Sequence, residues 1–349
     1  MSLTETAFYT RRAVNWAILG IIAYIILRIV WSILVVLFLI IFPPKAPPPN
    51  NAFGKLPAIK FPAVATPSAQ LVLQLETIQG AVPKASESAA VYFMPKTAPN
   101  LLSLNKAQEF ATRLEFDPAP IQESKNIYRF NDAQFPLRRL RYDIVSGNFI
   151  LRYAFERDPS VFVEKNLPLS EAAKIEAMNL LQSYDLYQTD LEEGATIVTF
   201  WRLQGEQLVP TSSLSQADAV RVDFFRKPIA DAKIFTPVPD EAPVSLMLSG
   251  SANAKKHMLQ FAYTFWPIDY QTSATYALKT SDEAWAELQA TKSYIARYPT
   301  GGGTAVVRNV YVGYYDSFEP QTYLQPIFVF EGDNGFLAYV PAVAAPWTE

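Results

Sequence analysis

One long apolar run near the N-terminus dominates the distribution of hydrophobic positions along the chain. It extends from Trp16 to Phe42 and contains a single charge, Arg28, with no proline and no acidic residue. A membrane-spanning helix needs roughly 20 apolar residues, and lipid offers the backbone no hydrogen bonds of its own. We therefore predict a transmembrane helix over residues 16–42, preceded by a cytoplasmic tail at residues 1–15.

A cleaved signal peptide is the alternative interpretation of this run. Its apolar part would comprise about 7–15 residues and would end in small residues at a cleavage site. Here the run ends in Phe42, Pro43 and Pro44, without such a pattern. The sequence favours an uncleaved anchor.

The charges beside the run indicate its direction. Arg11 and Arg12 precede it, which favours a cytoplasmic N-terminus, while Lys45, Lys55 and Lys60 follow it. Long domains cross the membrane largely regardless of their charge, and the absence of cysteine suits an exported bacterial protein. We expect a single-pass plasma-membrane protein with an extracytoplasmic C-terminal region.

Arg28 lies inside the apolar run and needs a physical explanation. A charge at the centre of a bilayer costs about 2.5–3.5 kcal/mol on insertion scales. The side chain can extend back to the N-terminal interface if the effective span is about 21–42. The alternative is a pair with a polar group of a partner's transmembrane helix, which makes Arg28 a candidate partner-binding residue.

Proline-rich stretches separate the predicted elements. Residues 43–67 contain eight prolines, which favour an extended chain and forbid a regular helix. At about 3.1 Å per residue such a tether reaches up to roughly 75 Å. Pro228–Pro243 is predicted to be a second long connection. For either stretch, the alternative is an extended segment packed on the folded part.

Beyond residue 68 the pattern alternates between strand-like and helical periods, as is typical of an α+β fold. Helices are predicted at Lys106–Leu114, Glu171–Tyr184 and Asp282–Ala296. Strands are predicted at Leu71–Ile78, Ala90–Met94, Ile127–Phe130, Arg138–Val145, Asn148–Phe155, Thr196–Leu203, Ala219–Phe225, Val244–Leu248, Met258–Trp266, Val306–Tyr315, Tyr323–Phe330 and Phe336–Val340.

The three helix starts share a pattern that suggests an internal repeat. Asn105, Ser170 and Ser281 each follow a leucine by three positions and are predicted to cap the helix. Each helix is then followed by strands. We infer repeated units of one helix packed on a small antiparallel sheet, at residues 68–165, 166–243 and 244–349.

Composition excludes several kinds of function. The net charge is −3 with both signs interspersed, so no basic surface for nucleic acid is expected. Cysteine is absent and His257 is the only histidine, which excludes thiol nucleophiles and argues against a zinc site. Gly301–Gly303 lack the lysine of a phosphate-binding loop. We expect no enzyme activity, no metal and no cofactor.

Two groups of charged residues leave weaker possibilities open. Acidic pairs that could serve a hydrolase occur at Glu192–Glu193, Asp240–Glu241 and Glu331–Asp333, although all fall in predicted turns or linkers. Arg138, Arg139 and Arg141 lie together on a predicted strand. They could contact an anionic wall polymer or lipid headgroups, but a solvated sheet face is the favoured interpretation.

The C-terminal part carries a family resemblance. Four segments follow one another: 276–285 (YALKTSDEAW), 310–315 (VYVGYY), 323–330 (YLQPIFVF) and 338–342 (AYVPA). In this order they resemble the YycI/YycH-type regulators, which belong with the PepSY-like modules of bacterial envelope proteins. The resemblance covers residues 258–343 only. It implies one N-terminal span, a non-catalytic extracytoplasmic region, and control of a sensor kinase or protease through the membrane helix.

Tyrosines are concentrated within the resembling segments. Tyr311, Tyr314 and Tyr315 surround Gly313, which is expected at a bulge or a close backbone approach, and Tyr323 opens the next strand. Aromatic side chains at an edge strand could form a groove that captures a peptide. Burial in a core is the alternative for the same residues.

These observations predict a non-catalytic, membrane-anchored protein that acts by protein binding as the regulator of an envelope signalling or protein complex. Its expected partners are the lipid bilayer and a membrane protein such as a sensor kinase, and a homo-oligomer is possible. The main alternative is a structural envelope scaffold or wall-binding protein.

Overall fold

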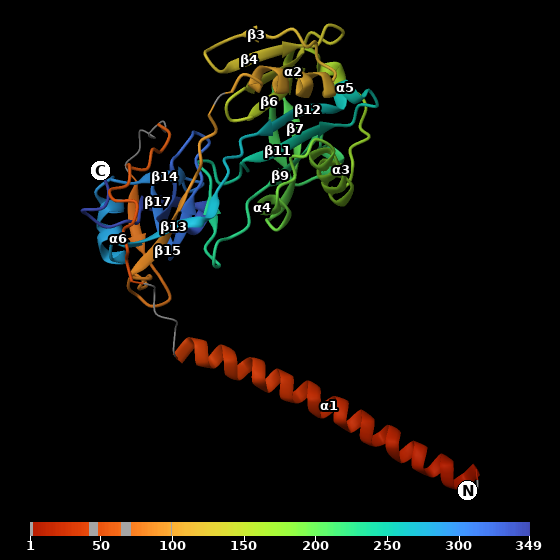
Figure 1. The fold of residues 1–349 in the computed structure, drawn as a ribbon, viewed down its shortest axis with the longest axis vertical. Coiled ribbons are helices and arrows are strands. Elements are labelled where there is room, and N and C mark those ends of the chain that lie inside the picture. The colour runs from red at the N-terminus through yellow and green to blue at the C-terminus, as the bar shows by residue number, and fades with distance from the viewer. Residues whose placement is uncertain (1–2, 42–47, 64–70, 99) are drawn as a thin grey trace. The chain divides into compact units, whose positions relative to one another are not determined.

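The computed structural model describes residues 3–41, 48–63, 71–98 and 100–349, and it forms two compact units, 1–47 and 48–349, that are described separately (Figure 1). The first unit is helix α1, Leu3–Ile41. Its part Trp16–Phe38 has a mean hydropathy of 2.7 and is long and apolar enough to cross a membrane. The predicted span ends one position beyond α1, at residue 42, which lies outside the described residues.

A nine-stranded antiparallel sheet forms one half of the second unit. Its strand order is β3-β4-β5-β6-β12-β11-β9-β7-β8. Helices α2 and α3 cover one face, where they enclose a core that includes Phe110, Leu181 and Phe224. The bounds are β3 Ile121–Gln122, β4 Ile127–Asn131, β5 Arg138–Asp143, β6 Phe149–Tyr153, β7 Thr196–Gln204, β8 Gln207–Thr211, β9 Ala219–Phe224, β11 Val244–Ser249, β12 Met258–Tyr263, α2 Ser103–Arg113, α3 Ser170–Ser183, α4 Thr189–Glu192 and α5 Ala254–His257.

An eight-stranded sheet forms the other half. Its main path is β1-β15-β16-β17-β14; β2 joins β13 to β16, and β10 pairs with β15. The pairings of β1 and β10 with β15 are parallel, and the others are antiparallel. The bounds are β1 Val72–Leu75, β2 Ser88–Phe93, β10 Ile234–Phe235, β13 Asp269–Ala277, α6 Ser281–Gln289, β14 Tyr294–Arg297, β15 Thr304–Tyr315, β16 Tyr323–Gly332 and β17 Leu337–Pro341.

The α+β class with one N-terminal helix is confirmed, whereas the expected division into three units is wrong. Strand β2 lies in the expected first unit but pairs in the eight-stranded sheet, and β11 and β12 of the expected third unit pair in the nine-stranded one. Alternation of polar and apolar residues defines which face of a strand is buried, but it does not define the neighbouring strand. The boundaries at 165/166 and 243/244 therefore separate no compact units.

All twelve predicted strands coincide with observed ones, within a few residues at their ends. The prediction missed β3, β8, β10, β13 and β14. Of these, β14 falls inside the predicted third helix, which ends at Gln289 rather than Ala296. Thr291 adopts a left-handed φ of 57°, which an α-helix does not tolerate, so the chain leaves the helix there.

The described part of the predicted tether is packed against the eight-stranded sheet. Leu56 is completely buried, and its amide donates to the Trp347 carbonyl at 2.8 Å. Phe61 stacks on Tyr294 with 4.9 Å between ring centroids. Prolines exclude a helix but allow an extended strap whose apolar residues reach a sheet. Residues 48–61 are therefore a strap rather than a free tether, while residues 43–47 and 64–67 lie outside the described residues.

The predicted caps are wrong at all three helices. Asn105 lies inside α2, and Ser170 and Ser281 are the first helical residues of α3 and α6. Thr280 caps α6: its hydroxyl accepts from the Glu283 amide, and the Glu283 carboxylate accepts from the Thr280 amide. Several polar residues near a helix start can serve as caps, and the backbone dihedrals decide among them.

Two special residues of β15 and β16 explain how β10 and the central strands pair. A side chain at Gly313 would meet the Phe235 ring at 2.8 Å, so the predicted close approach is confirmed. Pro326 lies within the central strand β16. Tyr314 lies opposite Pro326 in β15, and its amide donates to the Lys233 carbonyl beside β10, on the other side of β15. Tyr314 and Pro326 are therefore a pair without mutual hydrogen bonds, so the missing amide of Pro326 costs nothing in this pairing.

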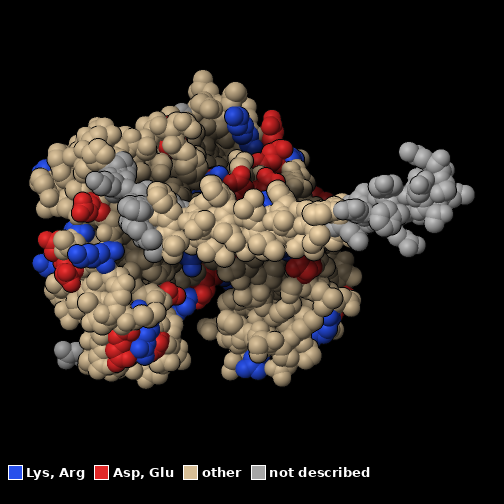
Figure 2. All heavy atoms as spheres, turned by 90° about the horizontal axis from the view of Figure 1, so that it is seen from below, with Lys and Arg blue, Asp and Glu red and all other residues tan. Residues whose placement is uncertain are grey.

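The face of the second unit drawn in Figure 2 carries acidic and basic side chains next to one another. Among the described residues, acidic and basic side chains often form ion pairs, such as Arg308 with Glu76 at 2.8 Å and with Asp333 at 2.6 Å. Exposed pairs of this kind contribute little stability but neutralise the local field. This view supports the expectation of interspersed charge.

The strap yields a test of stability. Leu56→Ala is expected to lower the free energy of unfolding by about 2–5 kcal/mol, because the change leaves a cavity in a closed core. Chemical denaturation measures the loss. The exposed neighbour Lys55 serves as the control, and Lys55→Ala should leave the unfolding curve unchanged. Equal stability of the two variants would contradict the strap.

Candidate functional site

Two of the four candidate tyrosines lie in the core, so the expected tyrosine-lined groove is not formed. Tyr314 and Tyr315 have exposed fractions of 5% and 1%. The Tyr314 hydroxyl donates to the Ala90 carbonyl at 2.9 Å, and the Tyr315 ring lies against Phe61 and Tyr339. The strap and β10 cover the face of the sheet that carries Tyr315. Tyr314 points to the other face and packs in a separate core cluster with Met94 and Leu324, so neither side chain has access to a partner.

The other two tyrosines are partly exposed. Tyr323 stacks on Phe53 of the strap, with 4.8 Å between ring centroids. Tyr311 lines a shallow depression of about 360 Å³ together with Lys233 and Glu331. Burial, with the Glu331 carboxylate beside it, raises the pKa of Tyr311, so the ring keeps its proton at neutral pH. Tyr323 also lines a concave site, a pocket of about 150 Å³ with Lys60 and Gln321, so two of the four tyrosines reach solvent.

Arg28 lies in α1 with its side chain exposed, among exposed apolar neighbours. Side chains of α1 from Trp16 to Phe38 contribute nothing to a protein core. The two explanations given for Arg28, extension to an interface or pairing with a partner helix, both remain predictions.

A further exposed surface lies on the outer side of α3. It is almost flat and is formed by Ala172, Ile175, Glu176, Asn179, Leu180 and Ser183. We call these residues the α3 face. Ile175 is 55% exposed, and Leu169, just before the helix, is 63% exposed. Within the α3 face itself, the exposed apolar groups are Ile175 and Ala172.

The rigidity of the α3 face comes from the opposite side of the helix. Ala173, Ala177 and Leu181 are completely buried and hold α3 against β7 and β9. At its C-terminal end, α3 is joined to α2, because Arg113 donates to the Ser183 carbonyl at 2.5 Å. The α3 face therefore lies on a helix that is fixed to the sheet.

The only histidine borders the α3 face. His257, at the end of α5, forms a 2.8 Å hydrogen bond between its Nε2 and the Glu176 carboxylate. This hydrogen bond raises the pKa of His257, although burial partly opposes the effect. The pair of His257 and Glu176 is partly exposed. Protonation of His257 changes the charge at the border of the α3 face.

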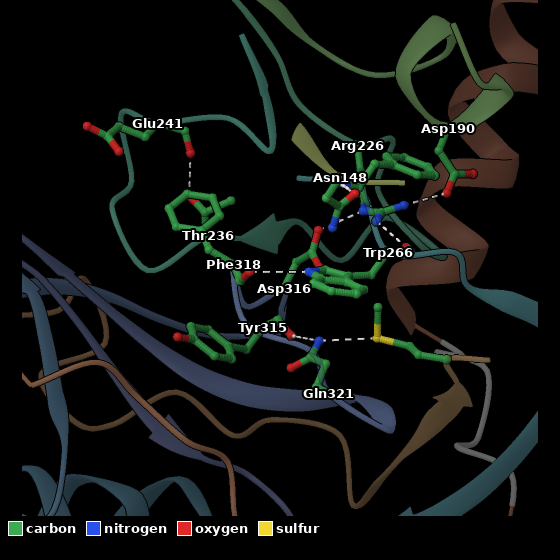
Figure 3. A network of polar contacts seen from close by, with 12 residues as sticks. Asn148, Asp190, Arg226, Thr236, Glu241, Trp266, Tyr315, Asp316, Phe318 and Gln321 are labelled. Carbon is green, nitrogen blue, oxygen red and sulfur yellow. Dashed lines mark hydrogen bonds and ion pairs between the residues drawn. The ribbon is translucent and has the colours of Figure 1, made fainter. Parts of the chain in front are cut away.

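The strongest polar cluster joins the two sheets (Figure 3). The Arg226 guanidinium contacts Asp316, just after β15, at 2.6 Å and Asp190 in α4 at 3.0 Å, and it also donates to the Trp266 carbonyl. Tyr270 of β13 donates to Asp190 at 2.8 Å. All of these groups are buried or half-buried. The cluster therefore connects the nine-stranded sheet to the eight-stranded one.

Asp316 is the least satisfied member of this cluster. Its side chain is 2% exposed, and its Oδ1 has no hydrogen-bond partner. Burial raises the pKa of Asp316, and the Arg226 guanidinium opposes that rise. Arg226 and Asp316 therefore form a buried ion pair that links the two sheets, and each depends on the other for its charge partner.

The acidic pairs named as hydrolase candidates do not converge. Glu193 pairs with Lys227, Asp240 with Arg297, and Asp333 with Arg308, each at a separate surface position. Within the described ranges, no three His, Cys, Asp or Glu side chains come together in a way that could hold a metal ion.

The sequence pattern did not predict which side of α3 is exposed. In the helix SEAAKIEAMNLLQS, apolar residues occur on more than one side. Ile175 and Leu180 lie off the buried stripe of Ala173, Ala177 and Leu181, which is a signal that could have been found. Without the sheet, however, no rule decides which apolar stripe is buried.

Comparison with known proteins adds little to this geometry. No family model and no curated protein matches the chain. Among solved structures, it is similar to an uncharacterized protein from Eubacterium rectale ATCC 33656, with 12% sequence identity and a TM-score of 0.40. The match covers 80% of this chain and 90% of that chain. A likeness at this level carries no argument, so the resemblance to YycI/YycH-type regulators stays a prediction.

The Arg226 cluster yields a prediction about the junction of the sheets. Arg226→Met is expected to destabilise the protein by about 3–5 kcal/mol, because it leaves buried carboxylates without their partner. Without Arg226, the pKa of Asp316 rises further above its unfolded value. Lower pH then favours the folded, protonated form, so the loss measured by denaturation should shrink between pH 8 and pH 5.

The control for this change is Arg308→Met, which removes an exposed arginine from an ion-paired surface position. It should leave stability nearly unchanged at both pH values. An equal effect of the two substitutions, or a loss at Arg226 that does not depend on pH, would be inconsistent with a buried cluster that holds the sheets together.

The His257–Glu176 pair predicts a second pH dependence of stability, which arises from protonation of a histidine rather than of a buried carboxylate. Because the folded-state pKa of His257 is raised, its stabilising contribution is complete below the unfolded value of about 6.5 and is lost as pH rises through the folded value. Glu176→Gln should therefore lower stability by a few tenths to about 1 kcal/mol at pH 5.5 and have almost no effect at pH 9. Thermal unfolding at the two pH values measures this difference, and an effect of equal size at both would contradict it.

Proposed function

We propose that the protein is a single-pass, membrane-anchored protein that acts by binding a partner protein, as the non-catalytic regulator of an envelope complex. The observation that carries the proposal is the α3 face, on which exposed apolar side chains lie on a helix fixed to a sheet. In this proposal α1 is the anchor, the N-terminus is cytoplasmic, and the second unit is extracytoplasmic.

The chemistry of the α3 face supports a protein ligand. Ile175 and Ala172 supply exposed apolar area, while Glu176 and Asn179 supply polar groups at its border. Protein interfaces combine an apolar centre with a polar rim in this way. The proposed partner therefore contributes an apolar segment with a polar edge, such as an amphipathic helix.

The anchor supports a partner in the same membrane. An exposed arginine within the apolar part of α1 is costly in lipid, and a polar group on a neighbouring span would reduce that cost. A sensor kinase, which the family resemblance implies, would bring such a span. In this proposal Arg28 couples the spans and the α3 face binds outside the bilayer.

The proposal predicts the effect of a charge on the α3 face. Ile175→Asp in the full-length protein should reduce recovery of the membrane partner by about tenfold or more, because a buried interface charge without a partner disrupts binding. Recovery is measured after photocrosslinking from position 179 in intact membranes. Folding should be unaffected, since Ile175 is exposed and exposed positions change stability by about 0.5 kcal/mol or less.

Ile78→Asp is the matched control, because Ile78 is a fully exposed isoleucine elsewhere on the second unit. It should recover the partner as the unmodified protein does. Arg28→Leu tests the coupling between spans separately and should weaken recovery while leaving the anchor in place. If Ile175→Asp and Ile78→Asp behave alike, the α3 face is not the binding surface.

A further inference from the structure

A second surface, formed by four arginines, lies on the face of the nine-stranded sheet opposite α2 and α3. In the register of β4, β5 and β6, Arg129 lies opposite Arg141 and Arg139 lies opposite Arg152. Their strand neighbours Phe130, Leu140 and Leu151 point into the core with the helices. Because successive side chains alternate between faces, these four side chains share the other face. We call them the arginine face.

This arrangement is unfavourable for the isolated fold. Residues directly opposite in an antiparallel pair have Cβ atoms about 4.5–5.5 Å apart, and like charges there are destabilising. The register creates two such pairs side by side on one face. None of the four residues fills the core, so packing gives no reason for the concentration of positive charge. Like charges placed opposite each other despite this cost are typical of a binding surface.

Nearby acids compensate only part of this charge. Glu123 contacts Arg141 at 2.6 Å and Arg129 at 3.6 Å, and Glu156 pairs with Arg152. The side chain of Arg139 is exposed and forms no hydrogen bond or ion pair with any described residue. Asp143 lies on this face of β5 as well, since it follows Arg141 by two positions. Four arginines thus face three acidic residues, which leaves one positive charge in excess and one guanidinium free.

The side-chain chemistry indicates a phosphate ligand. A guanidinium donates in a planar fork that matches phosphate or carboxylate with two parallel hydrogen bonds, which the point charge of lysine cannot do. Every cation in the two cross-strand pairs is an arginine. The spacing of Arg139 and Arg152 allows one phosphate group to be shared between them.

The anchor identifies the source of the phosphate. Helix α1 is apolar enough to cross a membrane and belongs to the same chain, so headgroup phosphates are present at a high effective concentration. Anionic membrane surfaces attract basic clusters by about 1 kcal/mol for each residue near the surface. We propose that the arginine face binds anionic phospholipid headgroups, with a phosphate seated between Arg139 and Arg152. This inference does not depend on a partner protein.

Vesicle binding tests the proposal with residues 48–349, which fold without α1 because every buried core residue belongs to this unit. The fragment should co-sediment with phosphatidylcholine vesicles that contain 30% phosphatidylglycerol and not with pure phosphatidylcholine. Arg139→Gln with Arg152→Gln should weaken this binding about tenfold or more. Added salt should weaken binding of the unmodified fragment as well.

Two further variants distinguish the loss of a binding surface from misfolding. Lys84→Gln with Lys106→Gln removes the same charge from exposed positions away from the arginine face, and binding should change less than twofold. Glu156→Gln frees Arg152 and should strengthen binding, a gain that misfolding cannot produce. Equal losses in the two double variants, or no gain with Glu156→Gln, would overturn the assignment.

Competition identifies the ligand. Inorganic phosphate at millimolar concentration should displace the fragment only weakly, because a surface of many headgroups binds several arginines at once. A fragment that binds polyphosphate but not the anionic vesicles would recognise a soluble polymer, which would overturn the lipid assignment.

Discussion

A single buried guanidinium decides how the second unit holds together. Arg226 reaches Asp190 on the side of the nine-stranded sheet and Asp316 on the side of the eight-stranded sheet, and these contacts surround it almost completely. Desolvation of such a cluster is unfavourable, so it is stable only when every partner is present. The neighbouring apolar residues, including Trp266 and Tyr314, close the same junction. The relative position of the two sheets, and with it the placement of every exposed surface on this unit, follows from this junction.

Two segments from elsewhere in the chain, the strap and β10, pack against the eight-stranded sheet. Their packing explains why tyrosines of this sheet are buried in a core. The strap crosses one face, and β10 lies beside β15 where Gly313 leaves room for Phe235. Tyrosine suits this environment because its ring is apolar, while its hydroxyl can reach a backbone carbonyl, as Tyr339 reaches that of Thr236. The two surfaces proposed for binding both belong to the half with the nine-stranded sheet: the α3 face on one side and the arginine face on the other.

These two surfaces differ in how far sequence reasoning could find them. The arginine cluster was visible as Arg138, Arg139 and Arg141, but its members were partly misassigned, since Arg138 is 5% exposed and bonded to Asp132 at 3.2 Å. The contributions of Arg129 and Arg152 appear only once β4 and β6 lie beside β5. For the α3 face the helix itself was predicted, but its exposed side was not. Both surfaces depend on residues that are distant in sequence.

The sequence alone determined the features that are encoded by neighbouring residues. The apolar helix, twelve of the strands and the α+β class all follow from periodicity over short windows, because a backbone segment responds mainly to its own pattern of apolar side chains. Only the tertiary structure decided which strands pair, whether the proline-rich segment is a tether or a strap, and which tyrosines are buried. Those outcomes depend on contacts such as that of Tyr314 with Ala90, whose energies belong to no single segment of the chain.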